Sequence, residues 1–169
     1  HFPTCPYPNP EIKEAMALGM DYAKRVQADL LLATDPDCDR VGIAVRRADG
    51  SYQLLSGNET GILLLDYILA QRTKHGTLPK DPVMVKTIVT MDLGERIAAH
   101  YGVETVNVLT GFKFIGEVIK QHIAEGHGTF LLGFEGRYGY LKCTYARDKD
   151  AVVASLLICE MAAFYKARN

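Results

Sequence analysis

The chain has 169 residues, of which 48% are hydrophobic and 23% charged, and its formal net charge at pH 7 is −1. This is the composition of a globular protein that can bury a core without disulfides or structural metal. The balanced charge, with no run of lysine and arginine, argues against nucleic acid or an anionic membrane as partner. No apolar run approaches the roughly 20 residues of a membrane span, and the four scattered cysteines are typical of reduced thiols. We therefore expect a cytoplasmic protein.

Hydrophobic periodicity predicts alternating helices and strands. An amphipathic helix is expected over residues 10–27 and a buried strand over 28–34, and residues 41–46 and 52–55 are typical of a hairpin. Further helices are expected over residues 59–73, 92–101, 112–125 and 149–167, and further strands over 83–89, 104–108 and 129–134. The alternation predicts an α/β fold with a mixed, partly parallel sheet flanked by helices. Part of another α/β domain would precede it, with a boundary near residues 47–57.

Several residues are suited to helix ends. Asn9, Asp92 and Asp148 offer side-chain oxygens where N-caps are wanted, and Gly102 and Gly126 fall where left-handed C-terminal residues are wanted. Asp148 and Asp150, as first-turn acids of the last helix, have a sufficient structural explanation. We assign them no catalytic role.

Three carboxylates stand at alternate positions directly after the first predicted strand. Asp35, Asp37 and Asp39 can converge on one side of the loop, and their oxygens are ligands that Mg²⁺ prefers. The carboxyl ends of strands are also where open α/β sheets place ligands. A solvated acidic turn is the structural alternative, because Asp and Pro both form turns. We favour the metal site.

Two known kinds of acidic loop are weaker alternatives. An EF-hand needs Gly and Glu where this chain has Arg40 and Arg46. A phosphatase of the haloacid-dehalogenase type would use Asp35 as its nucleophile. That family normally has Thr or Val where this chain has Asp39. It also needs a downstream acidic pair for its metal, and this sequence offers no clear counterpart.

Five ordered segments make the chain resemble the α-D-phosphohexomutases, and most closely the bacterial phosphoglucomutase/phosphomannomutase branch. They are DPDCDR at residues 35–40, KTIVT at 86–90, TGFKFIG at 110–116, GFEGRYGYL at 133–141 and RDKD at 147–150. The resemblance implies a four-domain enzyme. Residues 1–50 would be the end of its second domain, with the metal loop, and residues 51–169 its third domain, with a sugar-recognition loop.

In the family that the chain resembles, a phosphoserine and a bisphosphorylated sugar interconvert hexose 1-phosphate and hexose 6-phosphate. The resemblance implies that Asp35, Asp37 and Asp39 hold the Mg²⁺ that also binds the phosphoserine. A dication fits this chemistry, because positioning and electrostatics supply most of the catalysis of phosphoryl transfer. Arg40 would add a forked donor for phosphate oxygens. Its structural alternative is an outward arginine paired with a neighbouring carboxylate.

Two lysines become candidate active-site cations by the same resemblance. Lys86 interrupts an apolar strand, and a strand-edge lysine that reaches solvent is the common alternative. Lys113 lies near the start of a helix, where its charge opposes the helix dipole, so that an anion would explain its placement. A surface lysine is the other explanation.

The segment at residues 133–141 resembles the sugar-recognition loop of the family, in which Glu135 would accept hydrogen bonds from sugar hydroxyls. The branch usually has Glu and Ser where this chain has Gly136 and Arg137. Arg137 could fold back on Glu135 or reach the substrate phosphate. This departure bears on which sugar is bound.

The family's phosphoserine segment and the phosphate-binding loop of its fourth domain have no counterpart in this sequence. We therefore expect a mutase as the parent protein, with a hexose phosphate as substrate and the remaining domains of the parent as partners. We expect the 169-residue chain alone to have no turnover. A non-catalytic module that binds sugar phosphates is the remaining alternative.

Overall fold

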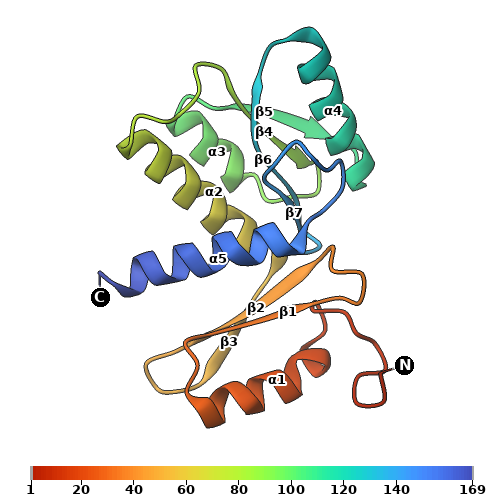
Figure 1. Ribbon diagram of the computed structural model, residues 1–169, viewed down its shortest axis with the longest axis vertical. Coiled ribbons are helices and arrows are strands. Elements are labelled where there is room, and N and C mark those ends of the chain that lie inside the picture. The colour runs from red at the N-terminus through yellow and green to blue at the C-terminus, as the bar shows by residue number, and fades with distance from the viewer. Residues whose placement is uncertain (1, 169) are drawn as a thin grey trace.

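The computed structural model describes residues 2–168, which form two sheets and five helices (Figure 1). The elements are α1 (Lys13–Val26), β1 (Leu30–Thr34), β2 (Val41–Arg46), β3 (Tyr52–Leu55), α2 (Gly57–Lys74), β4 (Pro82–Thr87), α3 (Leu93–His100), β5 (Glu104–Val108), α4 (Phe112–Glu125), β6 (Thr129–Glu135), β7 (Gly139–Leu141) and α5 (Ala151–Lys166). The first sheet is antiparallel, in the order β1-β2-β3. The second has the order β5-β4-β6-β7, with parallel β4–β5 and β4–β6 pairs and an antiparallel β6–β7 pair. The predicted mixed α/β fold is confirmed.

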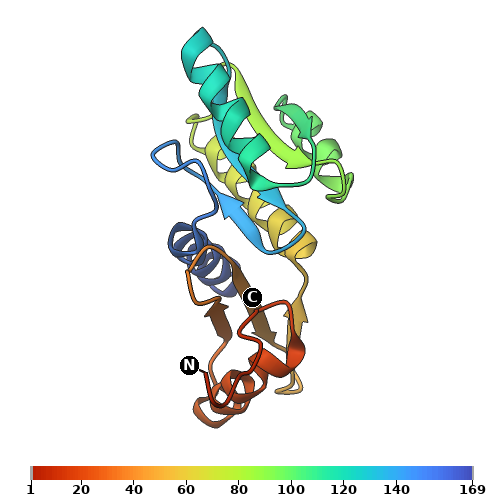
Figure 2. The same ribbon diagram turned by 90° about the vertical axis from the view of Figure 1, so that its right-hand side faces the viewer.

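Helix α5 lies between the two sheets, and α1 covers the far side of the first sheet (Figure 1). In the second sheet, α2 and α3 pack on one face and α4 on the other, as the turned view shows (Figure 2). One core joins both sheets through α5, because Ile43 of β2, Leu132 of β6 and Ile158 of α5 belong to the same buried cluster. The two sheets are thereby packed together along α5. No helix within residues 2–168 is long and apolar enough to cross a membrane.

The helix ends follow the expected chemistry in part. Gly102 and Gly126 both adopt φ of +69°, as predicted for left-handed C-terminal residues. Helix α2 begins at Gly57, two residues earlier than predicted, because Ser56 and Glu59 form a capping box. The Ser56 hydroxyl accepts from the Glu59 N–H at 3.2 Å, and the Glu59 carboxylate accepts from the Ser56 N–H at 2.7 Å.

Of the three predicted N-caps, Asp148 and Asn9 are wrong, and Asp92 is confirmed in position only. The carboxylate of Asp150, not Asp148, caps α5 by accepting from the N–H groups of Val152 and Val153 at 2.9 and 3.1 Å. Asp92 stands at the N-cap of α3, but it makes no side-chain capping bond. Asn9 forms a turn with Glu11 before α1, which begins only at Lys13.

The predicted strand over residues 83–89 is displaced toward the N-terminus, because β4 ends at Thr87. The chain turns there through a bond from the Thr90 N–H to the Thr87 carbonyl, at 2.9 Å. Ile88 and Val89 are consequently 56% and 66% exposed. Their apolar character alone made them look like strand residues.

Two features of the topology determine how the sheets meet. Strand β7, with only three residues, was not predicted, and its Gly139 forms an isolated antiparallel bridge with Arg40. Strand β3 pairs with β2, and the expected domain boundary between residues 50 and 51 lies in the turn that joins these two strands. The third strand of the first sheet therefore belongs to the segment 51–169. The carboxyl end of β1 therefore lies beside the β6–β7 turn.

Candidate metal and sugar-phosphate site

The acidic loop folds back on itself between β1 and β2. Oδ1 of Asp35 accepts from the N–H groups of Asp39 at 3.1 Å and Arg40 at 3.0 Å. Cys38 takes a left-handed conformation, with φ of +58°, which lets the loop turn tightly. One oxygen from each of Asp35, Asp37 and Asp39 lies within 4.8 Å of the others. The structure therefore brings the three predicted ligands together.

The electrostatics of this loop suit a hard divalent cation. Burial raises the pKa of Asp35, and the neighbouring carboxyl groups of Asp39 and Asp37 raise it further, while the hydrogen bond from the Arg40 N–H opposes them. Oδ1 of Asp39 is buried and has no hydrogen-bond partner among residues 2–168. A buried oxygen without a partner is costly, and a cation would remove both this cost and the repulsion. The all-oxygen donor set fits Mg²⁺.

Arg40 lies beside the acidic loop, at distances from its carboxylate neighbours that are longer than a hydrogen bond. Its Nε is 3.8 Å from Oδ2 of Asp35 and 3.8 Å from Oδ1 of Asp39, and its Nη1 is 4.0 Å from Oε1 of Glu11. Nε is buried and makes no hydrogen bond within the described part of the chain. This N–H group is thus free to donate to an anion. The alternative of an arginine paired with neighbouring carboxylates also agrees with these ion-pair distances, so the donor role of Arg40 stays a prediction.

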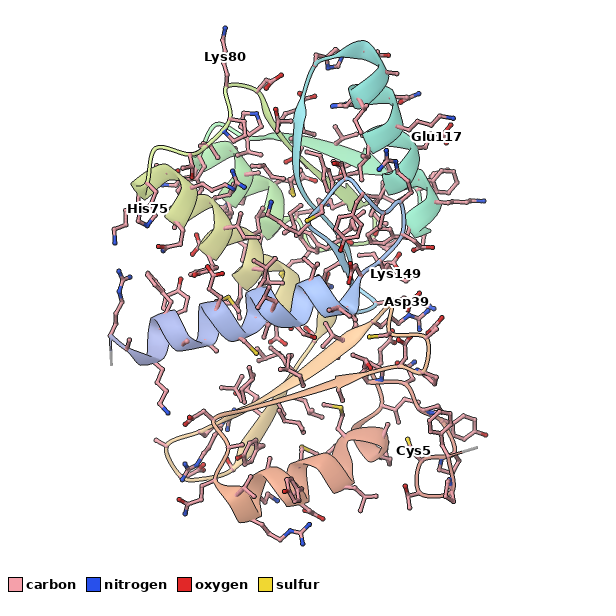
Figure 3. The ribbon with its side chains drawn as sticks, in the orientation of Figure 1. Cys5, Asp39, His75, Lys80, Glu117 and Lys149 are labelled. Carbon is pink, nitrogen blue, oxygen red and sulfur yellow. The ribbon has the colours of Figure 1, made fainter. Side chains whose placement is uncertain are left out.

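Glu135 and Lys149 complete the same corner. Glu135 ends β6, is 9% exposed, and has a pKa raised by burial, against the opposing charges of Lys149 and Arg40. Nζ of Lys149 lies 2.9 Å from Oδ2 of Asp39 and 3.0 Å from Oδ1 of Asp148 (Figure 3). Burial lowers the pKa of Lys149, but its hydrogen bonds to the two aspartates more than compensate, so the pKa is raised.

Main-chain bonds fix the acidic loop against the turn that follows Glu135. They run from the Val41 N–H to the Tyr138 carbonyl and from the Ala151 N–H to the Cys38 carbonyl, both at 3.2 Å, beside the bridge between Arg40 and Gly139. Loops from two different sheets and the start of α5 thus form one corner. Sequence reasoning missed Lys149 in this corner. Its signal was the RDKD segment at residues 147–150, of which only the two aspartates were weighed.

Lys86 lies elsewhere. It is 1% exposed on the central strand β4, so the alternative of a strand-edge lysine reaching solvent is wrong. Its Nζ contacts the Thr90 carbonyl at 3.0 Å, Asp92 at 3.4 Å and Glu95 at 3.0 Å. Lys86 is in register with Phe134 on β6, so it points to the face of the sheet opposite Glu135.

The two remaining predicted residues are exposed. Lys113 lies in the first turn of α4, its Nζ 4.9 Å from the centre of the Phe114 ring, and it lines a hollow with Lys120 and Arg147. Arg137 projects from the turn between β6 and β7. Its charge acts on Glu135 more weakly than those of Lys149 and Arg40, and it makes no ion pair with Glu135 within residues 2–168.

Comparison with known proteins connects the chain to one family. Residues 56–168 match the family model described as phosphoglucomutase/phosphomannomutase, alpha/beta/alpha domain III, and residues 1–50 match the corresponding domain II. The phosphoglucomutase of Staphylococcus saprophyticus is 41% identical over 152 residues, which is 90% of this chain and 27% of that protein. The chain thus spans about a quarter of the length of the curated relatives that it matches.

Two solved structures share the fold. A phosphoglucomutase/phosphomannomutase family protein from Burkholderia thailandensis has a TM-score of 0.65 and 18% identity, over 89% of this chain and 30% of its own. The N-acetylphosphoglucosamine mutase of Aspergillus fumigatus, in complex with GlcNAc-6P and magnesium, has a TM-score of 0.57 and 18% identity, over 88% of this chain and 37% of its own. With two adjoining family models covering nearly every residue, the chain belongs to the phosphoglucomutase/phosphomannomutase family.

Proposed function

We propose that the parent protein is a phosphohexomutase that interconverts hexose 1-phosphate and hexose 6-phosphate, with glucose or mannose as the sugar. The reaction would pass through a phosphoserine and a bisphosphorylated sugar. Residues 1–50 would supply the metal loop at the end of the second domain, and residues 51–169 the sugar loop of the third. Other domains of the parent would supply the phosphoserine. The observation that carries the proposal is the meeting of the aspartate trio and Glu135 in one corner, with Lys149 between them.

Asp35, Asp37 and Asp39 would hold Mg²⁺. When bound, Mg²⁺ supplies positive charge that offsets the negative charge on a transferring phosphoryl group. The similar fold of the Aspergillus mutase, whose structure contains magnesium, supports this choice of metal. Oδ1 of Asp39, which is buried and has no hydrogen-bond partner in the described part of the chain, supports it independently.

The other residues of the corner would bind and orient the substrate. Nε of Arg40, which makes no hydrogen bond within residues 2–168, would donate to a phosphate oxygen. The carboxylate of Glu135, to which no hydrogen bond is made from within residues 2–168, would accept from sugar hydroxyls. Lys113 and Arg137, both exposed, would meet the substrate phosphate from outside the corner. Lys86 would reach the substrate only after breaking its ion pairs with Asp92 and Glu95 at the start of α3.

Hydrolysis with Asp35 as nucleophile fits the loop less well. The Asp35 side chain is only 10% exposed, and its Oδ1 is already held by two backbone N–H groups. These bonds fix a carboxylate as a ligand, whereas a nucleophile needs an open approach. The binding-module alternative describes the isolated chain, which we expect to bind without turnover.

The test compares the chain and its full-length parent with a variant carrying Asp35→Asn, Asp37→Asn and Asp39→Asn. We expect calorimetry to show Mn²⁺ and Mg²⁺ binding to the unsubstituted chain and at least about a hundredfold weaker binding to the variant. The parent should convert glucose 1-phosphate to glucose 6-phosphate with Mg²⁺ and a bisphosphate primer, and the triple variant should not.

Two results would contradict the proposal. Glucose 6-phosphate formed by the 169-residue chain alone would disprove that the fragment lacks turnover. Equal metal affinity and equal turnover in the triple variant would remove the metal loop from the mechanism.

A further inference from the structure

Lys149 is the cation nearest to the acidic loop that comes from another part of the chain. It directly precedes Asp150, the N-cap of α5, and its side chain is 12% exposed. Its Nζ contacts Oδ2 of Asp39 at 2.9 Å, while Oδ1 of the same carboxylate has no hydrogen-bond partner within residues 2–168. One oxygen of Asp39 is thus held by an ammonium group, whereas the other has only the longer, 3.8 Å contact with Nε of Arg40. The second oxygen of this carboxylate is therefore open to a further cation.

The stem of Lys149 lies toward the sugar loop. A Cβ placed on Gly139 would lie 2.8 Å from Cγ of Lys149 and 3.3 Å from Cγ of Glu135. Both stems therefore pass over this glycine, and only a residue without a side chain leaves them room. The aromatic ring of Phe112, at the start of α4, lies with its centre 5.6 Å from Nζ. Lys149 consequently stands between the acidic loop and Glu135, with carboxylates on both sides.

An ammonium group and a dication compete for the same carboxylate. Two cations a few ångströms apart repel strongly in a partly buried site, where solvent screens charge poorly. Asp148 offers Lys149 a second partner at 3.0 Å that is not one of the three clustered aspartates. The side chain can therefore leave Asp39 without losing every counter-charge.

We propose that Lys149 is an internal counter-ion of the metal loop, which holds Asp39 when the loop lacks its cation and is released toward Asp148 and Glu135 when the cation binds. The inference rests on the proposed metal-binding function of the three aspartates. It gives this lysine a positioning role that couples metal occupancy to the sugar loop. Removal of the lysine should therefore strengthen metal binding.

The experiment is a calorimetric titration of Mn²⁺ into the 169-residue chain and its variants. Lys149→Met should bind Mn²⁺ about tenfold more tightly than the unsubstituted chain, whereas Lys149→Arg, which keeps the competing charge, should stay within about twofold. Lys166→Met is the matched control, because Lys166 is paired with Asp29 at the far end of α5 and its side chain is 66% exposed. Its affinity should not change.

A second measurement follows the lysine itself and separates release from a general effect of charge. In chain labelled with ¹³C and ¹⁵N on lysine, Mg²⁺ should shift the Cε and Nζ signals of Lys149 more than those of Lys113 or Lys166. The shift should saturate with the binding curve. Asp148→Asn, which removes the second partner, should weaken Mn²⁺ binding about threefold and keeps the inference testable if Lys149→Met does not fold.

The outcomes test the metal site and the role of Lys149 separately. If the unsubstituted chain binds Mn²⁺ no better than the triple aspartate variant, the metal site is wrong and the inference fails with it. If the metal site holds but Lys149→Met binds equally or more weakly, or the Lys149 signals do not move, only the counter-ion role is wrong.

Discussion

Two lysines, both shielded from solvent at the end of a strand or helix, are used differently in this fold. Lys86 has three partners, the Thr90 carbonyl, Asp92 and Glu95, all supplied by the segment that directly follows its strand. Lys149 has two, and one of them, Asp39, comes from the other sheet and belongs to the acidic cluster. The first lysine is satisfied locally, whereas the second depends on how the two sheets meet.

The difference indicates which region is structural and which is available for ligands. Around Lys86 each carboxylate has a partner, and the hydrogen bonds from Asn107 and from Lys86 lower the pKa of Glu95. Around Lys149, burial raises the pKa of Glu135, and two polar atoms, Oδ1 of Asp39 and Nε of Arg40, are buried without a hydrogen-bond partner among residues 2–168. Unsatisfied groups gathered in one place are costly for folding, so a ligand is the simplest explanation.

The strongest way to break the Lys149 corner is to push its sugar loop away from α2. A Cβ at Gly57 would overlap the Gly136 carbonyl oxygen and lie 2.6 Å from the Tyr138 nitrogen, both backbone atoms that cannot turn aside. We expect Gly57→Ala to lower the free energy of unfolding by about 3 kcal/mol, measured by urea denaturation.

Gly94→Ala is the matched control for this substitution. It adds the same methyl group within a helix, α3, but its Cβ would meet neighbours only at 3.5 Å or more. It should be neutral or stabilise the chain by about 0.5 to 1 kcal/mol, because alanine is the better helix former. A Gly57→Ala protein as stable as Gly94→Ala would show that the loop is not held against α2.

Removing each lysine tests the comparison directly. Lys86→Met should destabilise the chain by about 2 kcal/mol, because a buried bond to the Thr90 carbonyl is lost and Glu95 loses its ion pair, keeping only the bond from Asn107. Lys149→Met should cost less, about 1 kcal/mol or below, since Asp148 is 71% exposed and water can solvate it. Urea denaturation without metal gives both values. Equal losses in the free energy of unfolding would mean that the two lysines contribute equally to the stability of the fold.

The sequence predicts well what depends on neighbours along the chain. The alternation of helices and strands, the convergence of Asp35, Asp37 and Asp39, and the left-handed Gly102 and Gly126 all follow from local patterns, and the structure confirms them. What depends on the meeting of distant segments could not be predicted. Strand β7 has three residues and exists because it pairs with β6, and Lys149 contacts Asp39 across 110 positions of sequence.

A smaller effect separates the two aspartates on either side of Lys149. Asp150→Ala should cost about 1 kcal/mol, because its carboxylate caps α5 through two backbone N–H groups. Asp148→Ala should change stability by less than about 0.5 kcal/mol, because Asp148 is exposed and makes no cap. Thermal unfolding checks both. Equal losses would mean that the start of α5 does not depend on the cap at Asp150.

The smallest expected change in stability is a gain, from Glu135→Gln. Because the folded chain raises the pKa of Glu135, the folded state binds this proton more tightly than the unfolded state does. Between the ordinary glutamate pKa and the raised one, stability should therefore fall as the pH rises, and above this window the loss should be complete. Glutamine removes the titration.

The Glu135→Gln variant should therefore gain stability over the unsubstituted chain as the pH rises through that window, and keep a constant advantage at neutral pH. Urea denaturation at closely spaced pH values measures this difference, with Glu125→Gln as a control at an exposed glutamate. The same substitution at Glu135 should weaken hexose-phosphate binding, since an amide offers one acceptor oxygen where the carboxylate offers two. A variant that is less stable at neutral pH, with unchanged sugar-phosphate binding, would mean that Glu135 has a structural role only.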